Sequence, residues 1–205
     1  MLSRSCLLLC ALFLSACTTD PKTLYEQDVR TASTPLAESL QEALRLSEAE
    51  PLQLDPDLPP EYRIGLEEPR LLLHGLPSSY RVFRLALRAG QPYTLRVISD
   101  CVSCAGHTKY GLKPALFLLD EQGQVINDTP SQGLAGMRGV SLLMSGVAPR
   151  DGDFFLLVAA DNRDLGQEII LDQLSDAGLV TAPRRGTPMR SYPIGEIRAY
   201  GSQRL

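Results

Sequence analysis

The chain has 205 residues, and its 20 Lys and Arg against 24 Asp and Glu give a formal net charge of −4. This length is enough for one well-buried domain. The mildly acidic charge, with Arg184-Arg185 as the only basic pair, argues against nucleic acid as a partner.

The N-terminus has the pattern of an exported protein. Arg4 supplies a positive charge, residues 6–14 form an apolar run, and Leu14-Ser15-Ala16-Cys17 follows directly. The run is too short to span a membrane, which needs about 20 apolar residues, but it fits the core of a secretory signal. The tetrapeptide resembles the lipobox of bacterial lipoproteins, whose cysteine receives a diacylglyceryl group. We therefore expect residues 1–16 to be a removed signal peptide and Cys17 to be lipidated.

The residue after the lipidated cysteine indicates which membrane a bacterial lipoprotein reaches. By the same resemblance, lipoproteins that stay in the inner membrane usually carry Asp after the lipidated cysteine. Thr18 instead favours the outer membrane, with the domain on its periplasmic face. The alternatives are an ordinary signal peptide or a buried N-terminal helix. Thr18-Thr19-Asp20-Pro21 disfavours the helix, because it continues one poorly.

Residues 17–60 are expected to link the lipid to a domain. Residues 18–35 are polar without a regular apolar period, which predicts a tether. A short helix is expected from Thr34 as cap and Pro35 as first residue, and a loose tether throughout is the alternative. Its apolar face would carry Leu36, Leu40, Ala43 and Leu44. Pro51 and the Pro-rich residues 55–60 would form a stiff connector.

Residues 61–205 show short apolar or alternating segments separated by turn residues, with little room for helices. This pattern predicts a mainly β fold, an antiparallel, jelly-roll-like β-sandwich. Segments 80–88 and 93–98 alternate on either side of a four-residue turn and predict a hairpin. The expected strands are residues 70–74, 80–88, 93–98, 114–120, 125–126, 140–144, 154–160 and 194–200.

Five leucines of these strands are expected to point into the sandwich: Leu85, Leu87, Leu95, Leu118 and Leu157. Residues 161–178 are ambiguous. Residues 169–171 are consistent with a strand, residues 172–177 with a helical turn that ends at Gly178, and residues 182–188 with a loop.

The layout from residue 36 to residue 201 resembles the maltose-operon periplasmic protein (MalM) family. Segment 79–99 gives the family's strand–turn–strand block, and residues 153–165 resemble its late strand and acidic-polar loop. Lys113-Pro114-Ala115-Leu116-Phe117-Leu118-Leu119-Asp120-Glu121 resembles its Pro-x-apolar-x-x-Leu-Asp-Glu element, and the strand after Gly195 resembles its C-terminal end. The resemblance implies an exported, non-enzymatic accessory protein linked to maltose or α-glucan use. The Cys101-Val102-Ser103-Cys104 segment departs from the family pattern.

The cysteines are the residues with the most distinctive chemistry. Cys6 and Cys10 would leave with the signal, which leaves Cys101 and Cys104 as a pair. An even number in an exported chain favours a disulfide, here one that clips a loop. A redox-active CxxC needs a following helix, which residues 105–114 disfavour. His107 and Lys109 lie nearby in the sequence, and zinc binding stays open as a second alternative. Two cysteines and one histidine leave it one ligand short, and an oxidising compartment favours the disulfide.

Other candidate chemistry is sparse, and the sequence predicts no enzyme, catalytic residue, metal or cofactor. His74 is interpreted as a surface residue at a strand end. Three further groups of residues are interpreted as structural rather than functional. The glycines are expected in turns (Gly133, Gly136, Gly139), and the acidic residues in a solvated loop (Asp161, Asp164, Glu168). The tyrosines are expected at loops or sheet edges, with contact to a sugar as the alternative (Tyr110, Tyr192, Tyr200).

The sequence therefore predicts a lipid-anchored accessory protein that binds an envelope protein partner. A glycan-binding module and a thiol-active protein that uses Cys101 and Cys104 are the alternatives.

Overall fold

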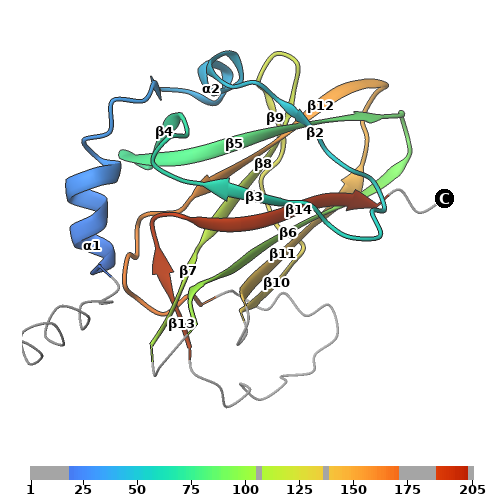
Figure 1. The fold of residues 1–205 in the computed structure, drawn as a ribbon. Coiled ribbons are helices and arrows are strands. Elements are labelled where there is room, and N and C mark those ends of the chain that lie inside the picture. Colours follow the sequence, from blue (N-terminus) through green and yellow to red (C-terminus); the bar gives the residue numbers. More distant parts are fainter. Residues whose placement is uncertain (1–18, 105–107, 136–138, 171–187, 203–205) are drawn as a thin grey trace, which may run out of the picture.

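The structure is a computed structural model that describes residues 19–104, 108–135, 139–170 and 188–202. Two β-sheets face each other and form a β-sandwich, as the sequence predicts (Figure 1). The first sheet has the order β1-β4-β5-β12-β8-β9, with β2 also beside β5. Its strands are β1 (Leu36–Ala37), β2 (Glu50–Pro51), β4 (Arg70–Leu73), β5 (Leu76–Leu87), β8 (Pro114–Asp120), β9 (Val125–Asn127) and β12 (Gly152–Ala160).

The second sheet has the order β10-β11-β6-β14-β3, and β7 lies beside β6 with β13 beside β7. Its strands are β3 (Glu61–Ile64), β6 (Pro92–Ser103), β7 (Lys109–Leu112), β10 (Gln132–Ala135), β11 (Gly139–Val147), β13 (Met189–Tyr192) and β14 (Gly195–Ser202). The long central strands all pair antiparallel. Three short pairs, β1–β4, β2–β5 and β7–β13, are parallel.

The predicted hairpin between residues 80–88 and 93–98 is wrong, because β5 and β6 belong to opposite sheets. β5 pairs with β12, and β6 pairs with β11 and β14. The turn between them crosses the end of the sandwich, where the Gly90 N–H donates to the Ala148 carbonyl at 2.9 Å. Two alternating strands and a short turn look the same in sequence, whether the strands lie side by side or face each other across a core.

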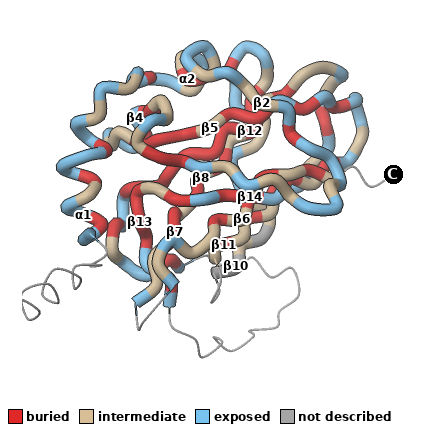
Figure 2. The backbone as a smooth tube through the Cα atoms, viewed as in Figure 1, coloured by how far each residue is buried: buried red, intermediate tan, exposed pale blue. Residues whose placement is uncertain are grey.

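Buried residues lie on the central strands of both sheets (Figure 2), and their apolar side chains form the core between the sheets. Leu85, Leu87, Leu95 and Leu118 lie in this core, as predicted. Leu157 is fully buried but lies on the outer face of the first sheet, so its predicted direction is wrong. Since β12 is apolar on both faces, its sequence does not reveal which face turns inward.

The outer face of the first sheet is covered by the N-terminal part of the chain. Helix α2 (Leu40–Leu46) begins after Ser39, whose hydroxyl accepts a hydrogen bond from the Glu42 N–H at 3.2 Å. The predicted start at Thr34 and Pro35 is therefore about one turn too early, and Leu36 belongs to β1. The Tyr80 hydroxyl donates to the Ala43 carbonyl at 2.9 Å and fastens α2 to the sheet. Burial raises the pKa of Tyr80 to about 12, with a contribution from the charge of Glu42.

The expected polar tether is also wrong for the described residues 19–35. Helix α1 (Pro21–Leu24) and the π-helical turn η2 (Tyr25–Val29) pack against the sandwich. Tyr25 and Val29 are buried against Leu165. Two apolar residues four positions apart in a polar segment gave too weak a signal to separate a short docked helix from a tether.

The remaining sequence predictions have mixed outcomes. All eight expected strands are present, with ends shifted by several residues, but β1, β2, β3, β7, β10 and β13 were not predicted. The expected helical turn at residues 172–177 and most of the 182–188 loop lie outside the described residues. In the described part of the chain, no helix is long and apolar enough to span a membrane.

Candidate functional site

The cysteine pair lies at the end of a strand hairpin. Cys101 belongs to β6, Cys104 follows that strand, and the two form a disulfide with Cα atoms 5.7 Å apart. Cys101 pairs with Gly111 of β7, and the register shifts between Cys101 and Ser103. The disulfide thus spans a bulged strand end.

This setting bears on the alternatives for the cysteines. The next described element after Cys104 is strand β7, so the described residues contain no helix N-terminus that would stabilise a thiolate at this position. His107 lies outside the described residues, and Lys109 is the first residue of β7. Among the described residues, no group of three or more His, Cys, Asp or Glu has an arrangement suited to a metal ion.

The same end of the sandwich carries two of the three aromatic candidates. Tyr110 of β7 and Tyr192 of β13 are neighbours, with ring centroids 5.6 Å apart. Tyr192 is buried, and its hydroxyl donates to the Thr19 carbonyl at 3.3 Å. Tyr200 lies on β14, away from this pair. The three tyrosines therefore do not form one sugar-binding platform.

The acidic residues after β12 form a structural ion cluster. Asp161 is 4 % exposed, and the guanidinium of Arg163 donates two hydrogen bonds to its carboxylate, at 2.8 and 2.9 Å, while the Arg163 N–H donates a third at 3.3 Å. Lys113 lies 3.1 Å from Asp161 and 3.0 Å from Asp164. Burial raises the pKa of Asp161, but the bonds from Arg163 and the charge of Lys113 outweigh it and lower the pKa to about 2. Glu168 is exposed and is not part of this cluster.

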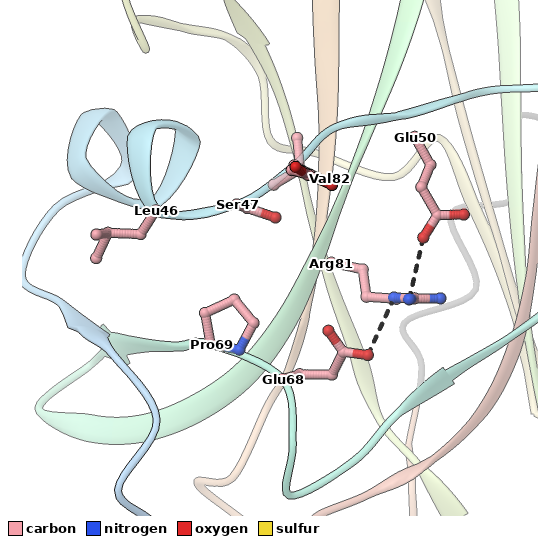
Figure 3. Close-up of a pocket in the computed structure, with 8 residues that line it drawn as sticks. Leu46, Ser47, Glu50, Glu68, Pro69, Arg81 and Val82 are labelled. Carbon is pink, nitrogen blue, oxygen red and sulfur yellow. Dashed lines mark ion pairs between the residues drawn. The ribbon is translucent and has the colours of Figure 1, made fainter.

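A groove of about 370 Å³ lies beside the end of α2, at the edge of β5 between β4 and β2 (Figure 3). Arg81 of β5 crosses it between two carboxylates, 3.0 Å from Glu50 and 3.2 Å from Glu68. Burial raises the pKa of Glu68, opposed by the charge of Arg81. Tyr62 lies under the guanidinium at 5.6 Å. The lining residues are Leu46, Ser47, Glu48, Glu50, Glu68, Pro69, Arg81 and Val82.

A second arginine fixes the N-terminal segment. Arg70 begins β4 and is only 7 % exposed. Its guanidinium donates to the carbonyls of Val29, Arg30 and Thr34 at 2.7 to 3.2 Å, and to the Thr34 hydroxyl at 3.1 Å. The first two acceptors are carbonyls at the C-terminus of η2, where a cation is favoured. Arg70 therefore acts as a clamp that closes the segment onto the sheet.

Sequence reasoning missed both arginines. Neither has a motif, and the only available signal is a charged residue within an apolar segment, at Arg70 before Leu71-Leu72-Leu73 and at Arg81 before Val82-Phe83. A buried charge in a strand needs partners, which is a signal that something polar packs there.

Two minor predictions can also be compared with the structure. His74 is an exposed turn residue between β4 and β5 with a φ of 53°, in agreement with its bland interpretation. Gly133 and Gly139 are strand residues rather than turn residues, and Gly136 lies outside the described part. A side chain at Gly139 would meet the Ser99 carbonyl of β6, so this glycine permits close strand pairing.

Comparison with known proteins found no matching family model, curated protein or solved structure. The resemblance to the MalM family therefore stays a prediction from sequence.

Proposed function

We propose that this chain is a lipid-anchored accessory protein of the bacterial envelope. Lipid on Cys17 would hold it at the periplasmic face of the outer membrane, and the sandwich would bind an envelope protein partner. The observation that carries the proposal is the lipobox-like Leu14-Ser15-Ala16-Cys17, followed within three residues by the folded chain at Asp20. The resemblance to the MalM family supports an accessory rather than a catalytic role.

The ion pairs of the sandwich support the non-catalytic part of this proposal. Asp161 is neutralised by Arg163 and Lys113, and Glu50 and Glu68 by Arg81. Such mutually paired groups are typical of structural ion pairs, whereas a catalytic acid or base needs an ionisable group available to a substrate.

Lipidation can be tested by growing cells with an alkyne-tagged palmitate and isolating the protein. The wild-type chain should take up the label, and Cys17→Ser should lose it and leave the membrane fraction, because the lipid is its main apolar anchor. Cys10→Ala, in the signal segment, is the matched control and should label like the wild type. A labelled Cys17→Ser form, or an unlabelled wild type, would refute the proposal.

A second candidate function, glycan binding, is favoured by one observation, the groove at Arg81. The carboxylates of Glu50 and Glu68 and the guanidinium of Arg81 line the groove and are suited to sugar hydroxyls. A maltodextrin at 100 times its dissociation constant should stabilise the fold by about 2.7 kcal/mol. In a thermal-shift assay, this gain should disappear in Glu50→Gln. No shift in the wild-type protein would rule out this candidate.

A further inference from the structure

The proposed lipid lies very close to the folded domain. Consecutive Cα atoms are 3.8 Å apart, so the Cα of Cys17 lies at most about 8 Å from that of Thr19. Thr19 already contacts the sandwich through the hydrogen bond from Tyr192. The next residue, Asp20, caps α1 by accepting hydrogen bonds from the Lys22 and Thr23 N–H groups, both at 3.0 Å. Almost no free chain separates the lipidated residue from the fold.

The attachment of this segment is firm rather than incidental. Tyr25 and Val29 are buried against Leu165, and Arg70 holds the end of η2 with its four hydrogen bonds. Pro21 is also buried. Because this segment is fixed on the sandwich, the point of lipid attachment at Cys17 stays close to one place on the domain, whereas a flexible tether would let the domain move away.

Thr19 is exposed and contacts one end of the sandwich. The Tyr192 hydroxyl of β13 donates to the Thr19 carbonyl, and the Tyr110 ring of β7 packs at a tilt beside Tyr192. Arg190 of β13 donates to the Gly166 carbonyl at 2.9 Å. In Figure 1, α1 lies at the left of the molecule, and β7 and β13 lie below and to the right of it. The disulfide lies on the same hairpin, since Ser103 pairs with Tyr110. We name this surface, formed by Thr19, Lys22, Tyr110 and Arg190, the anchor end.

The chemistry of the anchor end suits a lipid headgroup layer. Tyr110 is half-buried with an aromatic ring and a hydroxyl, a combination that membrane interfaces favour. Lys22 and Arg190 are exposed and basic, and each basic group near an anionic membrane adds about 1 kcal/mol of attraction. Two acidic residues offset this attraction: Glu168 lies opposite Arg190, and the exposed Asp20 lies beside Lys22, whose N–H it binds at 3.0 Å. The lipid would thus supply most of the affinity, and the side chains would set the orientation.

We propose that the sandwich is held end-on against the membrane, with the anchor end in contact with the phospholipid headgroups. This inference rests on lipidation of Cys17. The headgroup region is only about 5 to 8 Å thick per leaflet, comparable to the chain between Cys17 and Thr19. The domain therefore has no room to move away from the surface. Strand β6 has 12 residues at about 3.3 Å each, so its other end lies about 36 Å further out.

That outer end carries an exposed apolar residue that marks its position. Val147 ends β11 opposite Pro92, the first residue of β6, and is 61 % exposed. An end-on orientation presents this end, together with the turn from β5 to β6, to the periplasm.

The test uses the full lipidated chain in vesicles of phosphatidylethanolamine and phosphatidylglycerol. An environment-sensitive fluorophore is placed at Thr108→Cys, beside β7, or at Val147→Cys. Both positions are exposed. The disulfide keeps Cys101 and Cys104 unreactive under non-reducing conditions. A headgroup-attached spin label should quench the fluorophore at residue 108 strongly and the fluorophore at residue 147 weakly. Equal quenching at the two positions would overturn the end-on orientation.

A spacer variant supplies the matched control. About ten Gly and Ser residues inserted between Thr18 and Thr19 would add a flexible link of about 17 Å. This variant should still float with the vesicles, while quenching at residue 108 falls to the level at residue 147. Unchanged strong quenching would show that the anchor end binds lipid without the short link, and would overturn the role given to the link. Failure of the wild-type chain to float would instead refute the proposed lipid anchoring.

Discussion

At the scale of single residues, the attachment of the N-terminal segment to the first sheet depends on the guanidinium of Arg70. Arg70→Met keeps much of the apolar stem but removes four hydrogen bonds to Val29, Arg30 and Thr34. We expect a loss of about 2–3 kcal/mol in the free energy of unfolding, because buried carbonyls lose a charged donor. Urea denaturation measures this loss, and trypsin should cleave faster after Lys22 and Arg30.

Arg63→Met is the matched control for this prediction. Arg63 is 66 % exposed and lies 3.9 Å from Glu67, a surface contact that contributes little. If both variants unfolded at the same urea concentration, the clamp role of Arg70 would be wrong.

Asp161 is the residue whose ionisation is coupled to stability. Its pKa falls from 3.8 to about 2 in the folded protein, which corresponds to about 2 kcal/mol. Because the folded pKa is the lower one, this stability is present above pH 4 and is lost as the pH falls towards 2. We expect Asp161→Asn to be about 2 kcal/mol less stable at neutral pH, with a difference from the wild type that vanishes near pH 2.

Denaturation curves from pH 7 to pH 2 check this dependence. Asp153→Asn is the control, since Asp153 and Arg84 form an exposed pair 3.8 Å apart and should matter little. A difference between wild type and Asp161→Asn that stayed constant down to pH 2 would contradict the assignment.

At the scale of elements, the β6–β7 hairpin contains the two cysteines whose role the sequence leaves open. We expect the Cys101–Cys104 disulfide to be structural. It closes a very short loop, so its contribution belongs at the low end of the usual range of about 0–5 kcal/mol. Replacing both cysteines with Ser should speed hydrogen exchange in β7 and leave the melting temperature almost unchanged.

The thiol-active alternative makes a different forecast for the same hairpin. A reactive Cys101 would form a trapped mixed disulfide with a defined partner when Cys104 alone is changed to Ser. Recovery of that adduct from cells would replace the structural interpretation with the redox one. Cys101→Ser serves as the control, because it leaves only Cys104, outside the strand.

For the whole molecule, the N-terminal region is part of the fold rather than an appendage. Leu52 lies in the sandwich core, and Ala37 and Ala43 are fully buried on the outer face of the first sheet. A chain of residues 61–205 would uncover both regions. We expect it to lose its cooperative thermal transition, whereas a chain of residues 19–205 should melt like the complete mature protein. Equal melting of the two would restore a domain boundary near residue 60.

The sequence by itself determined the class of fold and the position of most strands. The sequence alternates between apolar and polar residues in β5 and β6 and is apolar throughout in β8 and β12. Strands of this kind have an apolar face that a second layer must cover, which predicts a sandwich. The sequence also predicts the lipid site at Cys17 and the pairing of Cys101 with Cys104, because both depend on local spacing.

Only the tertiary structure decided which strands are neighbours and what covers them. The turn at Gly90 crosses between sheets, and Leu157 faces outward under the N-terminal segment. The clamp at Arg70 joins residues about 40 positions apart. These features depend on contacts between distant segments, whose energies leave no periodic pattern in the local sequence. The short distance from Cys17 to the fold, and with it the proposed orientation on the membrane, follows from the same contacts.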